Sequence, residues 1–341
     1  MLAVGLGECG RHWVGGMLPQ VPEVQLAGCV DVDPAALDVA VERLGVPAGR
    51  CFTSLAAALA ATAPDAVLVA TTLPGHVPVA RAALESGCHI LLEKPFAPSL
   101  AEAQELVALA ERRGLVLMVS QNYRFFPAAR AAADLVRGGT LGAPHEVQVD
   151  FRHGATAPPG VGHRRLAQPL LLDMAIHHLD LLRLLLGREA TRVSCEAWNP
   201  RWSGFAGPPA AVAAIRFGDD LLASYRGSWL GRGPHTQWAG EWRIGFEAGE
   251  AWWTSRRSMH DAGGDRLVVW RPGCDVEELE LPAEGPIDRA GCLAAFAAAV
   301  RTGARPESSG RDNLASLALS LATVESATRG VPVAIDEVGS W

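Results

Sequence analysis

The chain has 341 residues, of which 49% are hydrophobic and 20% charged, a balance typical of a globular protein with room for two domains. Its formal net charge of −7 gives no electrostatic footprint for nucleic acid or for an anionic membrane. No apolar run reaches the length of a membrane span, and the seven cysteines include no Cys-x-x-Cys pair. We therefore expect a soluble cytoplasmic protein with reduced thiols, without a membrane or nucleic acid as partner.

The first third of the chain alternates short apolar runs with helical patterns. Near-continuous apolar runs are typical of parallel strands that are covered on both faces, and their alternation with helices predicts a doubly wound sheet. We expect this first domain to span residues 1–120. Its expected strands lie at 2–6, 24–30, 66–70, 89–92 and 115–119, and its expected helices at 9–18, 34–44, 76–86 and 99–113.

A glycine-rich turn, Gly5-Leu6-Gly7-Glu8-Cys9-Gly10, joins the first expected strand to the first helix. In this context the pattern G-x-G-x-x-G permits a tight turn and a close approach of the backbone to a pyrophosphate. Asp31 follows the second strand, where a carboxylate can accept hydrogen bonds from the ribose hydroxyls of NAD and would repel the 2′-phosphate of NADP. The pattern favours NAD over NADP, and the alternative is a turn that binds no nucleotide.

Lysine occurs only once in the sequence, at Lys94, against 29 arginines. An ammonium group is compact and can lose its proton, whereas guanidinium stays charged. We therefore expect Lys94 to have a role that arginine cannot fill. Glu93-Lys94-Pro95 ends the strand expected at 89–92, and such sheets bind ligands at the carboxyl ends of their strands. We predict that Lys94 lies beside the nicotinamide and hydrogen-bonds a reacting hydroxyl. The alternative is a lysine that survived compositional drift by chance.

After about residue 140 short turns separate the apolar segments, which predicts a mostly antiparallel sheet in a second domain, 121–341. The Pro-, Gly- and His-rich segment 154–168 is expected to form a mobile loop over a site. Eight of the ten tryptophans lie between 198 and 270, where they cover a sheet face or a subunit interface, or form a platform for sugars. The expected strands are 145–152, 191–198, 211–217, 221–229, 241–247, 250–254, 266–271, 276–281 and 331–335, with helices at 169–186, 288–301 and 312–328.

The helix expected at 169–186 is apolar nearly all round, which indicates that it is buried. Asp173, His177 and Asp180 stand at i, i+4 and i+7, so they share one face of that helix, and His178 lies off it. Asp173 can orient His177 as an acid or base near neutral pH. The alternative is an Asp–His–Asp network that only satisfies a buried helix. We expect no metal, because the spacing of His163, His177, His178 and Asp180 matches no common ligand set.

Together these motifs resemble the glucose–fructose oxidoreductase/inositol dehydrogenase (Gfo/Idh/MocA) family. The likeness covers nearly the whole chain, and it implies an N-terminal Rossmann domain and a C-terminal α/β domain with an open, mostly antiparallel sheet. It also implies that the last helices pack back toward the Rossmann domain and that the sheet builds a homodimer or homotetramer. The motifs are the glycine turn with Asp31, Thr72-Leu73-Pro74-Gly75-His76, Glu93-Lys94-Pro95, Asn122-Tyr123-Arg124-Phe125 and Asp173-x-x-x-His177.

The resemblance implies an NAD-dependent oxidoreductase that moves a hydride between nicotinamide and a secondary alcohol of a sugar, inositol or related polyol. His177 would take the hydroxyl proton, and Lys94 and Asp173 would assist. Two alternatives stay open: an NAD-dependent glycoside-cleaving enzyme of the same family type, and a non-catalytic NAD(H)-binding protein. The expected cofactor contacts are Gly5, Gly7, Glu8, Cys9, Gly10, Asp31, Thr71, Thr72, His76, Glu93 and Lys94. By position alone, the expected substrate contacts are Asn122, Tyr123, Arg124, Arg152, His163, Arg164 and His178.

Overall fold

The computed structural model describes residues 1–154, 158, 160–258, 261, 263–282 and 285–339. The chain forms two compact units. The first contains Met1–Asn122 and Gly285–Leu314, and the second contains Tyr123–Glu284 and Ala315–Ser340. Within the expected loop 154–168, residues 155–157 and 159 lie outside the described part.

The first unit is built on a six-stranded parallel sheet in the order β3-β2-β1-β4-β5-β6. This confirms the doubly wound parallel sheet. The third strand was not predicted, because two residues make no apolar run. The strands are β1 (Leu2–Val4), β2 (Gly28–Val30), β3 (Cys51–Phe52), β4 (Ala66–Val69), β5 (His89–Leu92) and β6 (Leu117–Val119).

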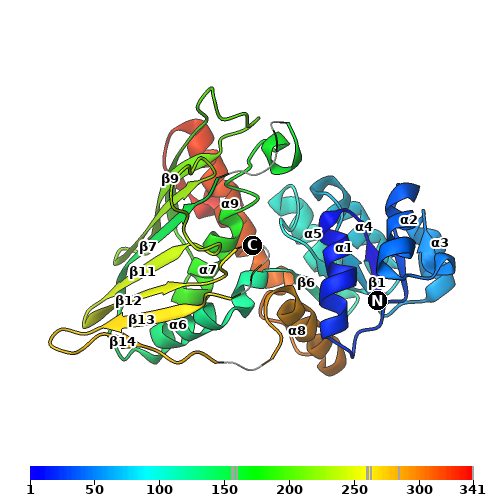
Figure 1. Cartoon of the computed structure of the whole chain (residues 1–341), viewed down its shortest axis with the longest axis horizontal. Coiled ribbons are helices and arrows are strands. Elements are labelled where there is room, and N and C mark those ends of the chain that lie inside the picture. Colours follow the sequence, from blue (N-terminus) through cyan, green and yellow to red (C-terminus); the bar gives the residue numbers. More distant parts are fainter. Residues whose placement is uncertain (155–157, 159, 259–260, 262, 283–284, 340–341) are drawn as a thin grey trace. The chain divides into compact units, whose positions relative to one another are not determined.

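The helices of this unit surround the short parallel strands (Figure 1). Asp33 begins α2 as expected, because its side chain accepts a hydrogen bond from the Ala35 amide at 3.0 Å. Ser99 caps α5 in the same way. The helices are α1 (Glu8–His12), which continues as a π-helical turn (Trp13–Met17) and a 3₁₀ turn (Leu18–Gln20), α2 (Pro34–Leu44), α3 (Leu55–Thr62), α4 (Leu73–Glu85), α5 (Leu100–Arg112) and α8 (Asp288–Thr302), with a further 3₁₀ turn at Ala48–Arg50.

The second unit contains a nine-stranded sheet in the order β14-β13-β12-β11-β7-β10-β9-β8-β15. Its pairs are antiparallel except β7 with β10, which confirms the mostly antiparallel sheet. The strands are β7 (Pro144–Arg152), β8 (Arg192–Trp198), β9 (Ala210–Phe217), β10 (Leu221–Ser228), β11 (Glu241–Phe246), β12 (Gly249–Thr254), β13 (Arg266–Trp270), β14 (Glu277–Glu278) and β15 (Val333–Ala334).

One face of this sheet is covered by α6 (Pro127–Gly138), α7 (Ala175–Leu186) and α9 (Gly310–Arg329) (Figure 1). Burial alternates along the strands accordingly, so that Tyr225 on β10 is buried whereas its neighbours Ser224 and Arg226 are exposed. The tryptophans divide between the two faces. Trp242 and Trp253 stack on the covered face with ring centroids 4.8 Å apart, and Trp252 lines a hollow on the outer face.

Three short 3₁₀ turns complete the described part, at Asn122–Phe125, Gly162–Arg165 and Ile335–Val338. Helix α6 was not predicted from the sequence, although its buried residues Ala128, Ala129, Ala132 and Ala133 recur at helical spacing. None of the helices in the described residues is long and apolar enough to cross a membrane.

Candidate active site

The turn after β1 depends on glycine at two of its positions. Gly5 has a φ of +90°, which L side chains rarely adopt, and a Cβ on Gly10 would lie 1.8 Å from the Gly5 carbonyl oxygen. A Cβ on Gly7 would meet nothing within 4 Å, so this part of the turn is open. Gly5 and Gly10 are therefore needed by the turn itself, and Gly7 leaves the backbone accessible. Glu8 beside them is exposed, and Cys9 is half-buried.

Asp31 stands directly after β2 and is fixed against the same turn. Its Oδ2 accepts a hydrogen bond from the Leu6 amide at 2.6 Å, and its Oδ1 accepts one from the Asp33 amide at 2.9 Å. Each carboxylate oxygen can accept a second hydrogen bond. The half-buried Asp31 side chain therefore fits the ribose hydroxyls of a dinucleotide.

Two of the residues that follow β4 have different roles, Thr71 as a candidate ligand contact and His76 as a link between two strand ends. The Thr71 hydroxyl oxygen is buried and has no hydrogen-bond partner among the described residues, an arrangement that favours a ligand at this position. Thr72 is exposed at the start of α4. The His76 ring nitrogens lie 2.8 Å from the Pro95 carbonyl oxygen and 3.1 Å from that of Thr71, while burial lowers the pKa of the ring. His76 thus ties the end of β5 to the end of β4.

The Glu93 carboxylate at the end of β5 is enclosed by protein groups. Its Oε1 accepts hydrogen bonds from Trp13 Nε1 and Arg289 Nε, both at 2.8 Å, and its Oε2 accepts one from the Lys94 amide at 3.2 Å. Burial alone would raise the pKa of Glu93, but the charge and hydrogen bond of Arg289 outweigh burial and bring the pKa to about 2. Glu93 is therefore ionised and directed at protein partners.

Lys94 is half-buried at this edge, next to a neutral thiol. The Cys9 Sγ lies 3.4 Å from Glu93 Oε1, and burial together with the Glu93 charge raises the pKa of Cys9 to about 12. Asn122, an expected substrate contact, is buried and donates a hydrogen bond from Nδ2 to Asp288 Oδ1.

Sequence reasoning missed Arg289, which α8 contributes to the Glu93 cluster in the same unit. The only signal available was an acid–base pair, Asp288-Arg289, at the start of an apolar helix. Nothing local connects that helix with β5.

In the second unit the buried helix begins later than expected. α7 starts at Ala175, so Asp173 lies in the preceding turn and does not share a helical face with His177. The amides of Met174 and Ala175 both bond the Leu170 carbonyl oxygen, at 3.0 and 2.8 Å, which gives a turn in place of the first helical turn. The apolar run 169–174 indicated burial correctly, but it does not continue the helix.

Asp180 also differs from expectation, because it pairs with Arg124 and not with His177. Arg124 donates to both Asp180 oxygens, at 2.7 and 2.6 Å, and Ser316 donates to Oδ1 at 2.5 Å. Both members of this bidentate pair are buried. Asp180 therefore belongs to an internal ion pair with Arg124, which its spacing from His177 did not indicate.

His177 contacts a different neighbour, Tyr123. The two rings stack with centroids 4.1 Å apart and planes inclined by 9°, and both residues are buried. His178 points into the core, where its Nδ1 lies 3.4 Å from the Tyr225 hydroxyl. Burial lowers the pKa of His178 to about 3, so it is neutral.

The remaining expected substrate contacts surround a second aromatic group. The His163 ring is 5.0 Å from that of Trp229, and the Arg164 guanidinium lies 5.0 Å from the Phe205 ring centroid. Burial lowers the pKa of His163, and the charge of Asp173 opposes that shift, so the structure brings Asp173 near His163. Arg152 is exposed at the end of β7. The described residues contain no group of three His, Cys, Asp or Glu side chains that could hold a metal ion.

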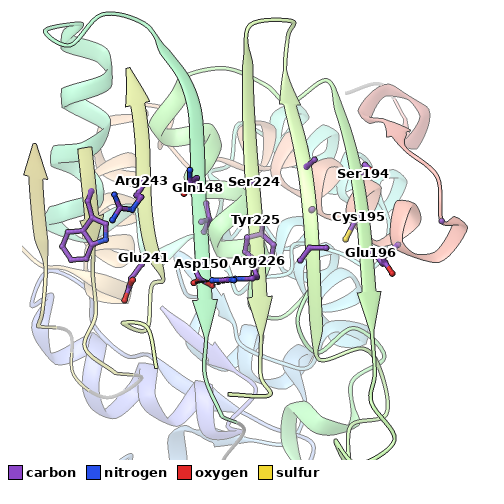
Figure 2. Close-up of a pocket in the computed structure, with 17 residues that line it drawn as sticks. Gln148, Asp150, Ser194, Cys195, Glu196, Ser224, Tyr225, Arg226, Glu241 and Arg243 are labelled. Carbon is purple, nitrogen blue, oxygen red and sulfur yellow. Dashed lines mark hydrogen bonds and ion pairs between the residues drawn. The ribbon is translucent and has the colours of Figure 1, made fainter. Parts of the chain in front are cut away.

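The outer face of the second sheet carries a hollow of about 1030 Å³ (Figure 2). Figure 2 shows Arg226 on β10 reaching across to Asp150 on β7, and Arg226 Nε lies 3.0 Å from Asp150 Oδ1. Both charge signs occur on this face, where Glu196, Glu241, Arg226 and Arg243 all line the hollow.

Comparison with known proteins identifies both parts of the chain. Residues 1–121 match the model of the oxidoreductase family with an NAD-binding Rossmann fold (GFO_IDH_MocA), and residues 129–251 match the GFO/IDH/MocA C-terminal domain. A D-apiose dehydrogenase from Paraburkholderia graminis is 30% identical over 314 residues, which cover 90% of this chain and 82% of the relative.

Two solved structures have the same fold over nearly their whole length. An oxidoreductase from Agrobacterium radiobacter, in complex with NAD⁺, L-tartaric acid and magnesium, gives a TM-score of 0.84 at 23% identity and covers 98% of each chain. The UDP-N-acetylglucosamine 3-dehydrogenase from Acidithiobacillus ferrooxidans gives a TM-score of 0.75 at 25% identity, with 96% of this chain and 97% of that chain covered.

Proposed function

The chain belongs to the Gfo/Idh/MocA family of oxidoreductases, and from this premise we propose that it transfers a hydride between NAD and a secondary alcohol of a sugar, inositol or related polyol. One observation carries the proposal. The glycine turn follows β1, Asp31 follows β2 and Lys94 follows β5, so all three stand at the carboxyl edge of one parallel sheet. This edge is where doubly wound sheets bind dinucleotides.

The cofactor is NAD, held by the backbone of Gly5–Gly10, by Asp31 and by the Thr71 hydroxyl. Asp31 supports NAD over NADP, because its carboxylate is fixed by two backbone amides and would repel a 2′-phosphate. When bound, the nicotinamide supplies the carbon that takes or returns the hydride.

The reaction needs a base as well as a hydride acceptor. As the C–H bond of the alcohol breaks toward the nicotinamide, the O–H proton must leave so that a carbonyl forms. We assign this proton to the His177 imidazole, which accepts it in one direction of the reaction and returns it in the other. Lys94 donates a hydrogen bond to the reacting oxygen, and the Asp173 carboxylate stabilises the imidazolium that forms on His177.

The names of the relatives support sugars as the substrate class. One relative is a D-apiose dehydrogenase and another is a UDP-N-acetylglucosamine 3-dehydrogenase. The substrate of this chain lies, on this proposal, among free sugars, cyclic polyols and nucleotide sugars.

The test has two stages. NAD⁺ and NADP⁺ are first titrated by calorimetry, and the protein is then incubated with NAD⁺ and D-apiose, myo-inositol, D-glucose or UDP-N-acetylglucosamine while NADH absorbance is followed. We expect NADH and a ketone in equal amounts from one of these. A protein that binds NAD⁺ but reacts with no alcohol, and whose NADH reduces none of the corresponding ketones, would contradict the proposal. Release of an aglycone from a glycoside without net NADH would favour the glycoside-cleaving alternative.

We also propose that two or four copies of the chain assemble through the outer face of the second sheet. Glu241 and Arg243 lie close together on that face, as do Asp150 and Arg226, so a second copy related by a twofold axis can match opposite charges. The variant Ala214→Glu adds charge to the lining of the hollow, and we expect its mass by analytical ultracentrifugation to fall to that of one chain. The matched variant Ala35→Glu, on an exposed position of α2, keeps the mass of the wild type. A monomeric wild type contradicts this assembly.

A further inference from the structure

The ring of Tyr123 has a second partner besides His177. The Arg256 Cζ lies 5.1 Å from the centroid of the Tyr123 ring and 5.2 Å from that of Phe126. The Tyr123 and Phe126 rings are inclined by 87°, with centroids 6.0 Å apart. A planar cation against two perpendicular rings restricts the orientation of both, because the guanidinium favours their electron-rich faces.

The backbone of Arg256 is held in an unusual conformation. Arg256 follows β12 with a φ of +57°, a region that side chains larger than glycine seldom occupy. Its carbonyl oxygen accepts a hydrogen bond from the Trp238 amide at 2.6 Å, and the residue is only 5% exposed. Such a conformation persists where the surrounding structure over-determines it, and it is concentrated at functional sites.

Asp265 links this segment with the one that carries Tyr123. Its Oδ1 accepts hydrogen bonds from the Ser255 hydroxyl and from the Ala128 amide, both at 2.9 Å. Ala128 lies in the first turn of α6, directly after the segment of Tyr123 and Phe126. Burial raises the pKa of Asp265, while these hydrogen bonds and the charge and amide of Arg256 oppose that shift. One carboxylate therefore anchors Arg256 and its two aromatic partners together.

We propose that Arg256 is a positioning residue for His177 and acts through the Tyr123 ring. The guanidinium fixes the plane of Tyr123, and the stacked imidazole, inclined by only 9°, takes its plane from that ring. Fixing the imidazole plane fixes the directions of its two ring nitrogens, and proton transfer requires that direction to be held closely. The inference rests on the proposed role of His177, but the stack itself can be tested without a substrate.

The first test uses NMR of the full-length protein with ¹³C-labelled histidine, in which His177→Gln assigns the His177 signal. In the wild type we expect the Cε1–H signal of His177 to be shifted upfield by the Tyr123 ring, and Tyr123→Leu to abolish the shift. Arg256→Met should move the signal part of the way toward its position in Tyr123→Leu. Tyr123→Phe, which keeps the ring, should leave the signal near that of the wild type. Arg256→Lys, which keeps the charge but not the planar group, should give a signal between those of the wild type and Arg256→Met.

The second test uses steady-state kinetics with whichever alcohol the wild type oxidises. We expect Arg256→Met to lower kcat about tenfold and to change KM less than about twofold, since misorientation of a base acts on the chemical step. Arg256→Lys, which keeps the charge but not the planar group, should restore part of kcat. The dissociation constant of NAD⁺ stays unchanged in all of these variants.

A matched control is Arg232→Met, because the Arg232 guanidinium lies 4.5 Å from the centroid of Trp202, a ring that is 59% exposed. It makes the same chemical change at another cation–ring contact and should alter neither readout. Two results overturn the proposal: a His177 signal in Arg256→Met that equals the wild-type signal, or a loss confined to KM, which would make Arg256 a direct substrate contact. If the wild type oxidises no alcohol, the proposed function fails, and the NMR comparison still decides the positioning role.

Discussion

Arg289 Nε donates a hydrogen bond to Glu93 Oε1 at 2.8 Å, and this contact attaches α8 to the end of β5 in the first unit. Both side chains are largely buried, with exposed fractions of 19% for Arg289 and 6% for Glu93. Burial lowers the pKa of Arg289, but the Glu93 charge outweighs that effect and raises it, so both groups stay charged. Arg289 therefore neutralises the Glu93 carboxylate at the edge where we place an anionic cofactor.

Glu93→Gln should destabilise the fold strongly. Glutamine keeps the size of the side chain but removes its charge, and an unpaired buried cation costs about 3–5 kcal/mol of unfolding free energy. Urea denaturation measures the loss. The matched variant Glu105→Gln removes a carboxylate from an exposed pair with Arg81, whose atoms are 2.6 Å apart, and should cost less than about 1 kcal/mol. If both variants lose the same unfolding free energy, burial of the Glu93–Arg289 pair makes no extra contribution to stability.

Lys94→Arg should retain the fold and NAD⁺ affinity and lose most turnover. Arginine keeps the positive charge, but its planar fork is larger and cannot take the place of one ammonium group. We expect kcat to fall by about 100-fold or more, within the range that removal of a positioned donor costs. Calorimetry with NAD⁺ and rate measurements separate binding from turnover. A kcat near that of the wild type would mean that the lone lysine is a compositional accident.

Asp31→Ser should reduce the preference for NAD over NADP. Serine keeps one hydroxyl near the ribose but removes the charge that repels a 2′-phosphate. We expect the affinity for NAD⁺ to fall about tenfold, a loss of about 1.4 kcal/mol, while that for NADP⁺ rises. Asp33→Ser is the matched control, because serine can still cap α2. Among the described residues, the Asp33 side chain bonds the Ala35 amide and not the glycine turn. If the ratio of the NAD⁺ and NADP⁺ affinities changes equally in both variants, Asp31 is not the residue that selects NAD over NADP.

His178 should make the fold sensitive to mild acid. Its pKa is about 3 in the folded protein and 6.5 in the unfolded chain, so below pH 6.5 the unfolded chain binds the proton first. The stability contributed by neutral His178 is therefore complete above pH 6.5 and is lost as the pH falls toward 3. His178→Gln cannot bind this proton. The difference in unfolding free energy between wild type and variant should fall by up to about 1.4 kcal/mol per pH unit from pH 6 to 4. A constant difference over that range would contradict the assignment.

Features that depend on neighbours in sequence could be predicted. The glycine turn, Asp31 after β2 and Lys94 after β5 each sit at a junction of strand and turn, and α2 has the expected bounds because Asp33 and Pro34 begin it. The combination of motifs also identified the family correctly. The chemistry placed at each junction stays a prediction until the variants are measured.

Contacts between distant segments could not be predicted. Glu93 and Arg289 are 196 residues apart, and no local pattern in either segment requires the other. The start of α7 was placed too early because an apolar run indicates burial and not backbone conformation. Asp180 was expected beside His177 from spacing alone, but a bidentate guanidinium, Arg124, is its partner.

Because the chain has a single lysine, it carries only one side-chain amine. Lys94 is half-buried and stands at the end of β5. Reductive methylation with ¹³C-formaldehyde therefore has a single side chain to label, and the dimethylamine at Lys94 gives a methyl signal beside that of the Met1 amine. Because the reagent leaves arginine untouched, the guanidinium groups give no signal. The chain thus carries its own spectroscopic probe at the edge where the cofactor is proposed to bind, without any engineered cysteine or tag.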